Sequence, residues 1–151
     1  MDEILTADKI HVYGLSLPEP TTRSHYFHSW ILHINYIASL YAAMAKVRDA
    51  LYPYAIIHTI RTNMLPNIYR TAVYQRGSKA LRRSADVLYT RTASILREIE
   101  KEAIYKKQTQ APNIKHSFLS LLSLMQSNSC TATSPLCLLS LANLEAAINA
   151  L

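Results

Sequence analysis

Apolar residues in the middle of the chain recur at spacings of three and four, the pattern of helices that bury one face. The longest run begins near Ser24 and ends at Pro53, and it predicts a central core helix because proline cannot continue a helix interior. A shorter apolar segment, YAIIHTIRTNML, is predicted to stop before Pro66. The apolar positions of the central helix are Phe27, Trp30, Ile31, Ile34, Ile37, Leu40, Tyr41, Met44, Val47 and Leu51.

The rest of the chain also has helical patterning. A long helix is predicted from about Asn67 to Lys107, interrupted or kinked near Gly77, where Ser78 can cap a new start. Residues 114–126 predict an apolar helix, and SNSCTATS predicts a loop. The pair Ser134 and Pro135 is a strong helix start, with serine as the N-cap and proline in the first turn. Residues 24–151 therefore predict an all-α bundle of about five helices.

The first 23 residues differ from this pattern. KIHVYGLSLPEP alternates apolar positions and then reaches two prolines, which predicts one short strand and an extended arm. A lone strand is not stable by itself. It must pair with another molecule, lie against the helices, or be the remnant of an element of a longer polypeptide. We therefore divide the chain into an arm, residues 1–23, and a helical domain, residues 24–151.

The amino-acid composition agrees with a helical fold, and the lack of targeting and membrane-spanning patterns indicates where in the cell to expect the protein. Two glycines and six prolines in 151 residues leave little material for the turns of a β-rich fold. The start of the chain lacks the pattern of a signal peptide, and no uncharged apolar run reaches the roughly 18–20 residues that cross a bilayer. We expect a cytoplasmic protein without membrane contact. Cys130 and Cys137 are expected to be reduced and structural.

The net charge of +6 is concentrated in one part of the chain. Residues 61–91 carry seven basic side chains and one acidic side chain, Asp86, whereas the flanking segments nearly balance. A charge that served only solubility would be scattered, so the concentration favours a surface that meets phosphates or an acidic partner.

A helical projection of residues 78–105 separates two faces. One is an apolar seam for packing, and the other is a polar row that Arg76 joins if the helix continues through Gly77. The seam consists of Leu81, Ala85, Leu88, Thr92, Ile95, Ile99 and Ala103, and the row of Lys79, Arg83, Thr90, Ser94, Arg97 and Lys101. Basic residues one to two turns apart are about 5–11 Å apart along the axis, commensurate with successive phosphates.

An amphipathic helix is polar outside in any case, so the row has an ordinary explanation as a solvated face. The lack of acids around it favours binding to nucleic acid. Arg82 points about a quarter turn or more away from the row. Tyr69, Tyr74 and Tyr89 interleave with the basic residues, but tyrosines at a helix surface more often cover the edge of the core. The predicted nucleic-acid-binding residues are Arg61, Arg70, Arg76, Lys79, Arg82, Arg83, Arg91, Arg97 and Lys101.

Catalytic signatures are not evident in the sequence. It has no Gly-rich phosphate loop, no nucleophile elbow and no Cys–His pair, so we expect no enzymatic activity, no cofactor and no metal. One alternative comes from Arg23 and His28 in RSHYFH. This Arg-x4-His spacing resembles the motif of HEPN ribonucleases, helical bundles that use the pair to cleave RNA, although here it lies near the N-terminus.

The C-terminal third is unusually apolar, and Glu145 is the only charge in its last helix. It serves either as plain core or as a protein–protein surface, as in a self-assembling, capsid-like subunit.

A basic row, an apolar C-terminal part and a lone predicted strand together resemble the small subunits of Cascade-type CRISPR effector complexes, which act in antiviral defence. The resemblance is one of architecture over about residues 24–151. It implies a non-catalytic subunit that stacks with other subunits and copies of itself. Such a subunit contacts the guide RNA–target DNA duplex or the displaced single strand independently of sequence. It also implies that the chain can arise as the C-terminal portion of a large subunit.

Overall fold

The computed structural model describes residues 22–44, 52–105 and 111–151, and every regular element in these ranges is helical. This confirms the predicted all-α bundle. The predicted arm lies outside the described residues except for Thr22 and Arg23. The elements are α2 (Arg23–Met44), α3 (Tyr52–Thr59), the π-helical turn η1 (Ile60–Met64), α4 (Leu65–Tyr69), α5 (Ala72–Arg76), α6 (Lys79–Tyr105), α7 (Ala111–Gln126), α8 (Ser129–Ala132) and α9 (Pro135–Asn149).

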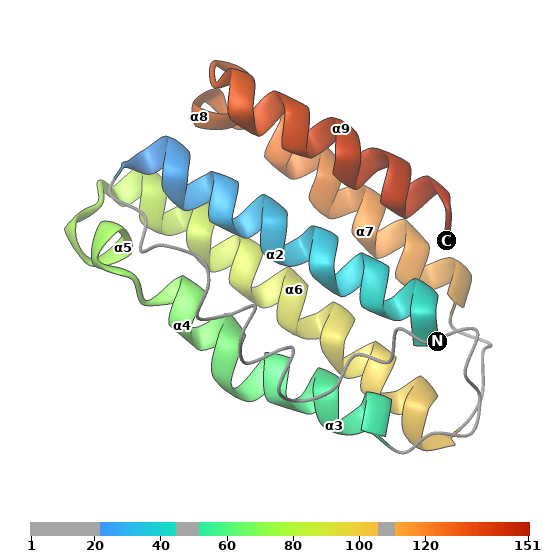
Figure 1. Ribbon diagram of the computed structural model, residues 1–151. Coiled ribbons are helices and arrows are strands. Elements are labelled where there is room, and N and C mark those ends of the chain that lie inside the picture. The colour runs from blue at the N-terminus through green and yellow to red at the C-terminus, as the bar shows by residue number, and fades with distance from the viewer. Residues whose placement is uncertain (1–21, 45–51, 106–110) are drawn as a thin grey trace.

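The long helices α2, α6, α7 and α9 lie side by side, and α3 with α4 forms a further rod along α6 (Figure 1). Helix α2 packs most extensively on α9 and also contacts α6 and α8. It is therefore enclosed by its neighbours, as its apolar residues predict. Its interior positions, including Trp30, Ile31, Ile34 and Ile37, have no exposed surface. Residues 45–51 of the predicted central helix, with Val47 and Leu51, lie outside the described residues. The predicted end at Pro53 is wrong, because this proline lies in the first turn of α3, where no N–H is needed.

The chain around Pro66 differs from the prediction. The predicted break before this proline is wrong, because α3 passes through η1 directly into α4, with Pro66 in the first turn of α4. A proline has no N–H to donate, and its ring crowds the preceding turn. The wider π-helical turn accommodates it, and the N–H of Leu65 bonds to the carbonyl of Ile60, five residues back. The helix instead ends at Tyr69, so the long helix predicted from about Asn67 is already broken at Arg70 and Thr71, before the interruption at Gly77.

The predicted interruption at Gly77 is a complete break. Helix α5 ends at Arg76, and α6 starts at Lys79 with the Ser78 hydroxyl accepting a hydrogen bond from the Leu81 N–H, at 3.3 Å. A β-carbon at position 77 would lie 2.7 Å from Leu81 Cδ2 and 2.9 Å from the Val73 carbonyl oxygen. Glycine therefore permits the close approach of α5 to α6.

The C-terminal helices follow their capping residues. The side chain of Asn128 accepts a hydrogen bond from Cys130 N at 2.9 Å and starts the short α8 within the segment predicted as a loop. Ser134 caps α9 as predicted, accepting from Cys137 N at 3.3 Å. Both cysteines are free thiols, and Cys137 is buried. In the described part of the chain, none of the helices has the length and apolar character needed to cross a membrane.

Candidate nucleic-acid interface

Helix α6 has the two faces that its sequence predicts. The described seam residues are buried against the neighbouring helices, while the basic members of the opposite row are exposed. Because 27 residues form one continuous helix, the seam fixes the direction of the whole row. The buried seam residues are Leu81, Ala85, Leu88, Thr92, Ile95 and Ile99, and the exposed row residues are Lys79, Arg83, Thr90, Ser94, Arg97 and Lys101. The side chain of Ala103 lies outside the described residues.

The four basic residues of the row form two pairs, Lys79 with Arg83 and Arg97 with Lys101. The two members of each pair are about one helical turn apart. At 1.5 Å per residue, Arg83 and Arg97 are about 21 Å apart along the helix axis. Among the described acidic side chains, none lies within ion-pair distance of Lys79, Arg83 or Arg97. Lys101 pairs with Glu98 at 3.3 Å, but both side chains are substantially exposed. Such surface pairs are weak and leave the ammonium group available to a stronger anion.

Arg61 is separated from this row by its contacts. Its Nε donates to the carboxylate of Glu100, which also accepts from His58 Nδ1 at 3.0 Å. Burial pushes the pKa of Glu100 upward, but the hydrogen bonds from Arg61 and His58 outweigh that effect and hold the pKa below its usual value. The Arg61 guanidinium therefore joins η1 to α6 and does not belong to the row.

Arg82 and Arg91 also have contacts within the fold. Arg82 donates to the carbonyl oxygen of Gln75 at 2.6 Å and lies 6.0 Å from the centre of the Tyr74 ring, which ties α6 to α5. Arg91 donates to Ser120 Oγ at 2.7 Å and ties α6 to α7. Both side chains are nevertheless exposed, and at 3.6 residues per turn they lie on opposite flanks of the row.

Arg70 and Arg76 are exposed but do not belong to α6. Arg70 follows the last residue of α4, and Arg76 is the last residue of α5. Because the helix breaks at Gly77, neither side chain continues the α6 row, and the row is shorter than the full basic segment.

The three tyrosines of the basic segment pack on one another. The rings of Tyr74 and Tyr89 lie 4.6 and 4.4 Å from the ring of Tyr69, centre to centre. The hydroxyls of Tyr69 and Tyr74 donate to Asp86 Oδ1 at 2.5 and 3.1 Å. The bond to Asp86 is the main cause of a raised pKa for Tyr69. These rings cover the edge of the core, as expected, and they also occupy the one acid of the basic segment.

Arg23 and His28, the pair with ribonuclease-like spacing, lie in the first turns of α2. Arg23 is exposed, while His28 Nε2 lies 2.7 Å from Ser140 Oγ of α9. Burial, and then the nearby His25, lowers the pKa of His28. The imidazole thus joins two helices. Within the described ranges, histidines, cysteines and acids form no cluster of three or more suited to a metal ion.

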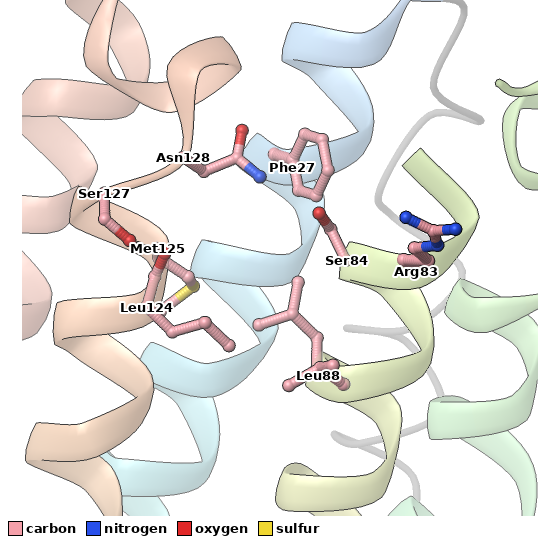
Figure 2. Close-up of a pocket in the computed structure, with 9 residues that line it drawn as sticks. Phe27, Arg83, Ser84, Leu88, Leu124, Met125, Ser127 and Asn128 are labelled. Carbon is pink, nitrogen blue, oxygen red and sulfur yellow. Dashed lines mark hydrogen bonds between the residues drawn. The ribbon is translucent and has the colours of Figure 1, made fainter. Parts of the chain in front are cut away.

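A hollow of about 290 Å³ opens beside Arg83, between α6, the start of α2 and the end of α7 (Figure 2). Sequence reasoning missed it, because it exists only where the turn before α8 meets two other helices. One signal in the sequence is Val87, an apolar residue that follows Arg83 by one turn and does not belong to the apolar seam; the structure leaves it 37% exposed. The hollow is lined by Phe27, Arg83, Ser84, Val87, Leu88, Leu124, Met125, Ser127 and Asn128.

Comparison of the chain with family models, curated proteins and solved structures gives no match.

Proposed function

We propose that the protein is a non-catalytic subunit that binds the nucleic-acid backbone through the α6 row, by its four basic residues Lys79, Arg83, Arg97 and Lys101. The observation that carries this proposal is the row itself. Four cationic side chains lie on one exposed face of a single helix, and three of them have no ion-pair partner among the described acids. Unpaired cations in such an array attract a regularly spaced polyanion.

The row has dimensions suited to a strand of phosphates. From Lys79 to Lys101 it spans about 33 Å of helix axis at 1.5 Å per residue. Each pair places two charges about 6 Å apart along that axis. Contacts of this kind position a backbone and carry no direct information about base sequence. Binding that depends on them is therefore sequence-independent and weakens as salt rises.

A second surface supports membership of an assembly. Leu136, Leu138 and Leu139, at the start of α9, are 49, 49 and 63% exposed. Leu136 and Leu139, three residues apart, share one face of α9, and neighbouring exposed apolar side chains are typical of contacts with another protein. A basic row together with such a surface agrees with the resemblance to small subunits of CRISPR effector complexes, which stays a prediction. The same leucines favour the second candidate, a structural subunit that assembles with copies of itself.

Charge reversal tests the binding proposal. The double variant Lys79→Glu/Arg83→Glu should lose binding to single-stranded DNA and RNA at low salt, because it replaces two attractions with two repulsions. Arg23→Glu/Lys115→Glu is the matched control, since it changes the net charge equally at positions outside the row. Circular dichroism should show unchanged helicity in both variants.

Equal binding by the row variant and the wild type would refute the proposal. Intact RNA at the end of the assay is expected; cleavage that disappears in His28→Ala would instead support the ribonuclease alternative. Light scattering without nucleic acid tests the self-assembling alternative, which predicts large particles that Leu139→Glu dissociates.

A further inference from the structure

The hollow beside Arg83 has features of a ligand site that the row alone does not explain. Phe27, Leu88 and Met125 form a buried apolar floor, and Val87 lines the solvent-exposed side of the hollow. The volume of about 290 Å³ lies just below the roughly 300–1,000 Å³ of small-molecule pockets. It is suited to one small, flat group and not to a folded segment.

Polar groups meet over this apolar floor. The Asn128 side chain uses its Oδ1 to accept from Cys130 N, so its amide nitrogen is left to donate. Figure 2 shows that amide nitrogen and the Ser84 hydroxyl pointing toward Phe27, with the Arg83 guanidinium to one side beyond Ser84. The Ser127 hydroxyl is occupied by the Leu124 carbonyl, at 2.9 Å. The site therefore offers apolar contact, two polar groups and a cation at its edge.

The position of Arg83 connects the hollow with the α6 row. Arg83 belongs to both, and Val87 follows it by one turn on the side of α6 that faces α7. When Arg83 binds a phosphate of a strand, the nucleoside attached to that phosphate therefore lies at the mouth of the hollow. A nucleobase is flat, has apolar faces, and carries hydrogen-bonding atoms at its edge. It combines the properties that this lining selects.

We propose that the hollow receives one base of a single-stranded nucleic acid while Arg83 holds the adjoining phosphate. This inference rests on the proposed function of the α6 row, and it implies that the protein prefers single-stranded nucleic acid to a duplex. In a duplex, each base is paired and stacked, and turning one out costs a few kcal/mol. A single strand has no pairing to break. Contact of one base with aromatic and apolar side chains is worth roughly 1–3 kcal/mol, or about 5- to 150-fold in affinity.

The test compares three fluorescent oligonucleotides of equal phosphate count per strand at low salt: oligothymidine, the same strand with all bases removed, and a mixed-sequence duplex. Wild-type protein should bind oligothymidine about tenfold more tightly than the abasic strand. Val87→Phe should abolish this preference by filling the mouth of the hollow, while its binding to the abasic strand stays unchanged. Because Val87 is partly exposed, the larger ring does not have to enter the core.

Ser117→Phe is the matched control, because it adds the same ring at an exposed α7 position that does not line the hollow. It should keep the tenfold preference. Equal binding of oligothymidine and the abasic strand by the wild type would overturn the base site and leave the row intact. Failure of all three oligonucleotides to bind would instead reject the function of the row itself. An unchanged preference in Val87→Phe would also overturn the base site.

Discussion

His33 is a buried histidine that should make the fold sensitive to acid. Its side chain has no exposed surface, and the described structure provides no hydrogen-bond partner for either ring nitrogen. The Trp30 ring lies edge-on to it, with ring centres 6.5 Å apart. Burial lowers the pKa of His33 from 6.5 to about 4, because the core offers nothing that stabilises an imidazolium.

The sign of the effect follows from proton linkage. The unfolded chain binds a proton at His33 near pH 6.5, whereas the folded protein binds it only near pH 4. His33 therefore does not reduce the free energy of unfolding well above pH 6.5. That free energy declines as the pH falls from 6.5 toward 4. The total loss is about 3 kcal/mol at 1.36 kcal/mol per pKa unit, and about 2 kcal/mol of it should be present at pH 5.

Urea unfolding at pH 7.5 and pH 5 measures this loss. His33→Leu removes the titrating group while keeping an apolar side chain in the core, so about 2 kcal/mol of the difference between the two pH values should disappear. The exposed His116 gives the control, and His116→Leu should leave the difference unchanged. The residual slope of His33→Leu includes His28, whose pKa is also lowered by burial. Identical pH dependence in wild type and His33→Leu would refute the reasoning.

Three further substitutions test the local structure, each by urea unfolding at pH 7.5. Gly77→Ala should destabilise the protein by about 1–3 kcal/mol, because the added β-carbon meets the backbone of α5 at 2.9 Å; wild-type stability would contradict the close approach. Ser134→Ala should cost about 1 kcal/mol through loss of the α9 cap, whereas Ser123→Ala at an exposed α7 position should cost little; equal effects would argue against the cap. Glu100→Ala should cost about 1–3 kcal/mol, below the range for fully buried pairs because its arginine partner is 29% exposed. Glu145→Ala, at an exposed position, should be nearly neutral, and a similar loss in both variants would contradict the role of the ion pair.

Features that depend on neighbours in the sequence were predictable. The apolar seam of α6 follows from helical periodicity, and Ser134 and Ser78 follow from capping chemistry, so the structure has each of them where the sequence predicts it. The break at Gly77 was expected for the same local reason. The break before Pro66 was wrongly predicted, because a π-helical turn depends on how the segment packs and not on proline alone.

Features that depend on distant residues were not predictable. Arg61 looked equivalent to the other basic residues, but its partner Glu100 lies 39 positions later, and only folding brings them together. The hollow combines residues from α2, α6 and the end of α7, so no segment of the chain contains its pattern. The row survives as a prediction because its members share one helix, while the base site required the folded structure.

The central claim is that the α6 row binds phosphates, and a salt titration of binding to single-stranded DNA tests it most directly. Four phosphate contacts predict that the logarithm of the association constant falls with the logarithm of salt concentration with a slope of about −3. Removing two contacts in Lys79→Ala/Arg83→Ala should reduce that slope to about half. Absence of binding at low salt, or a slope that the double variant leaves unchanged, would contradict the account.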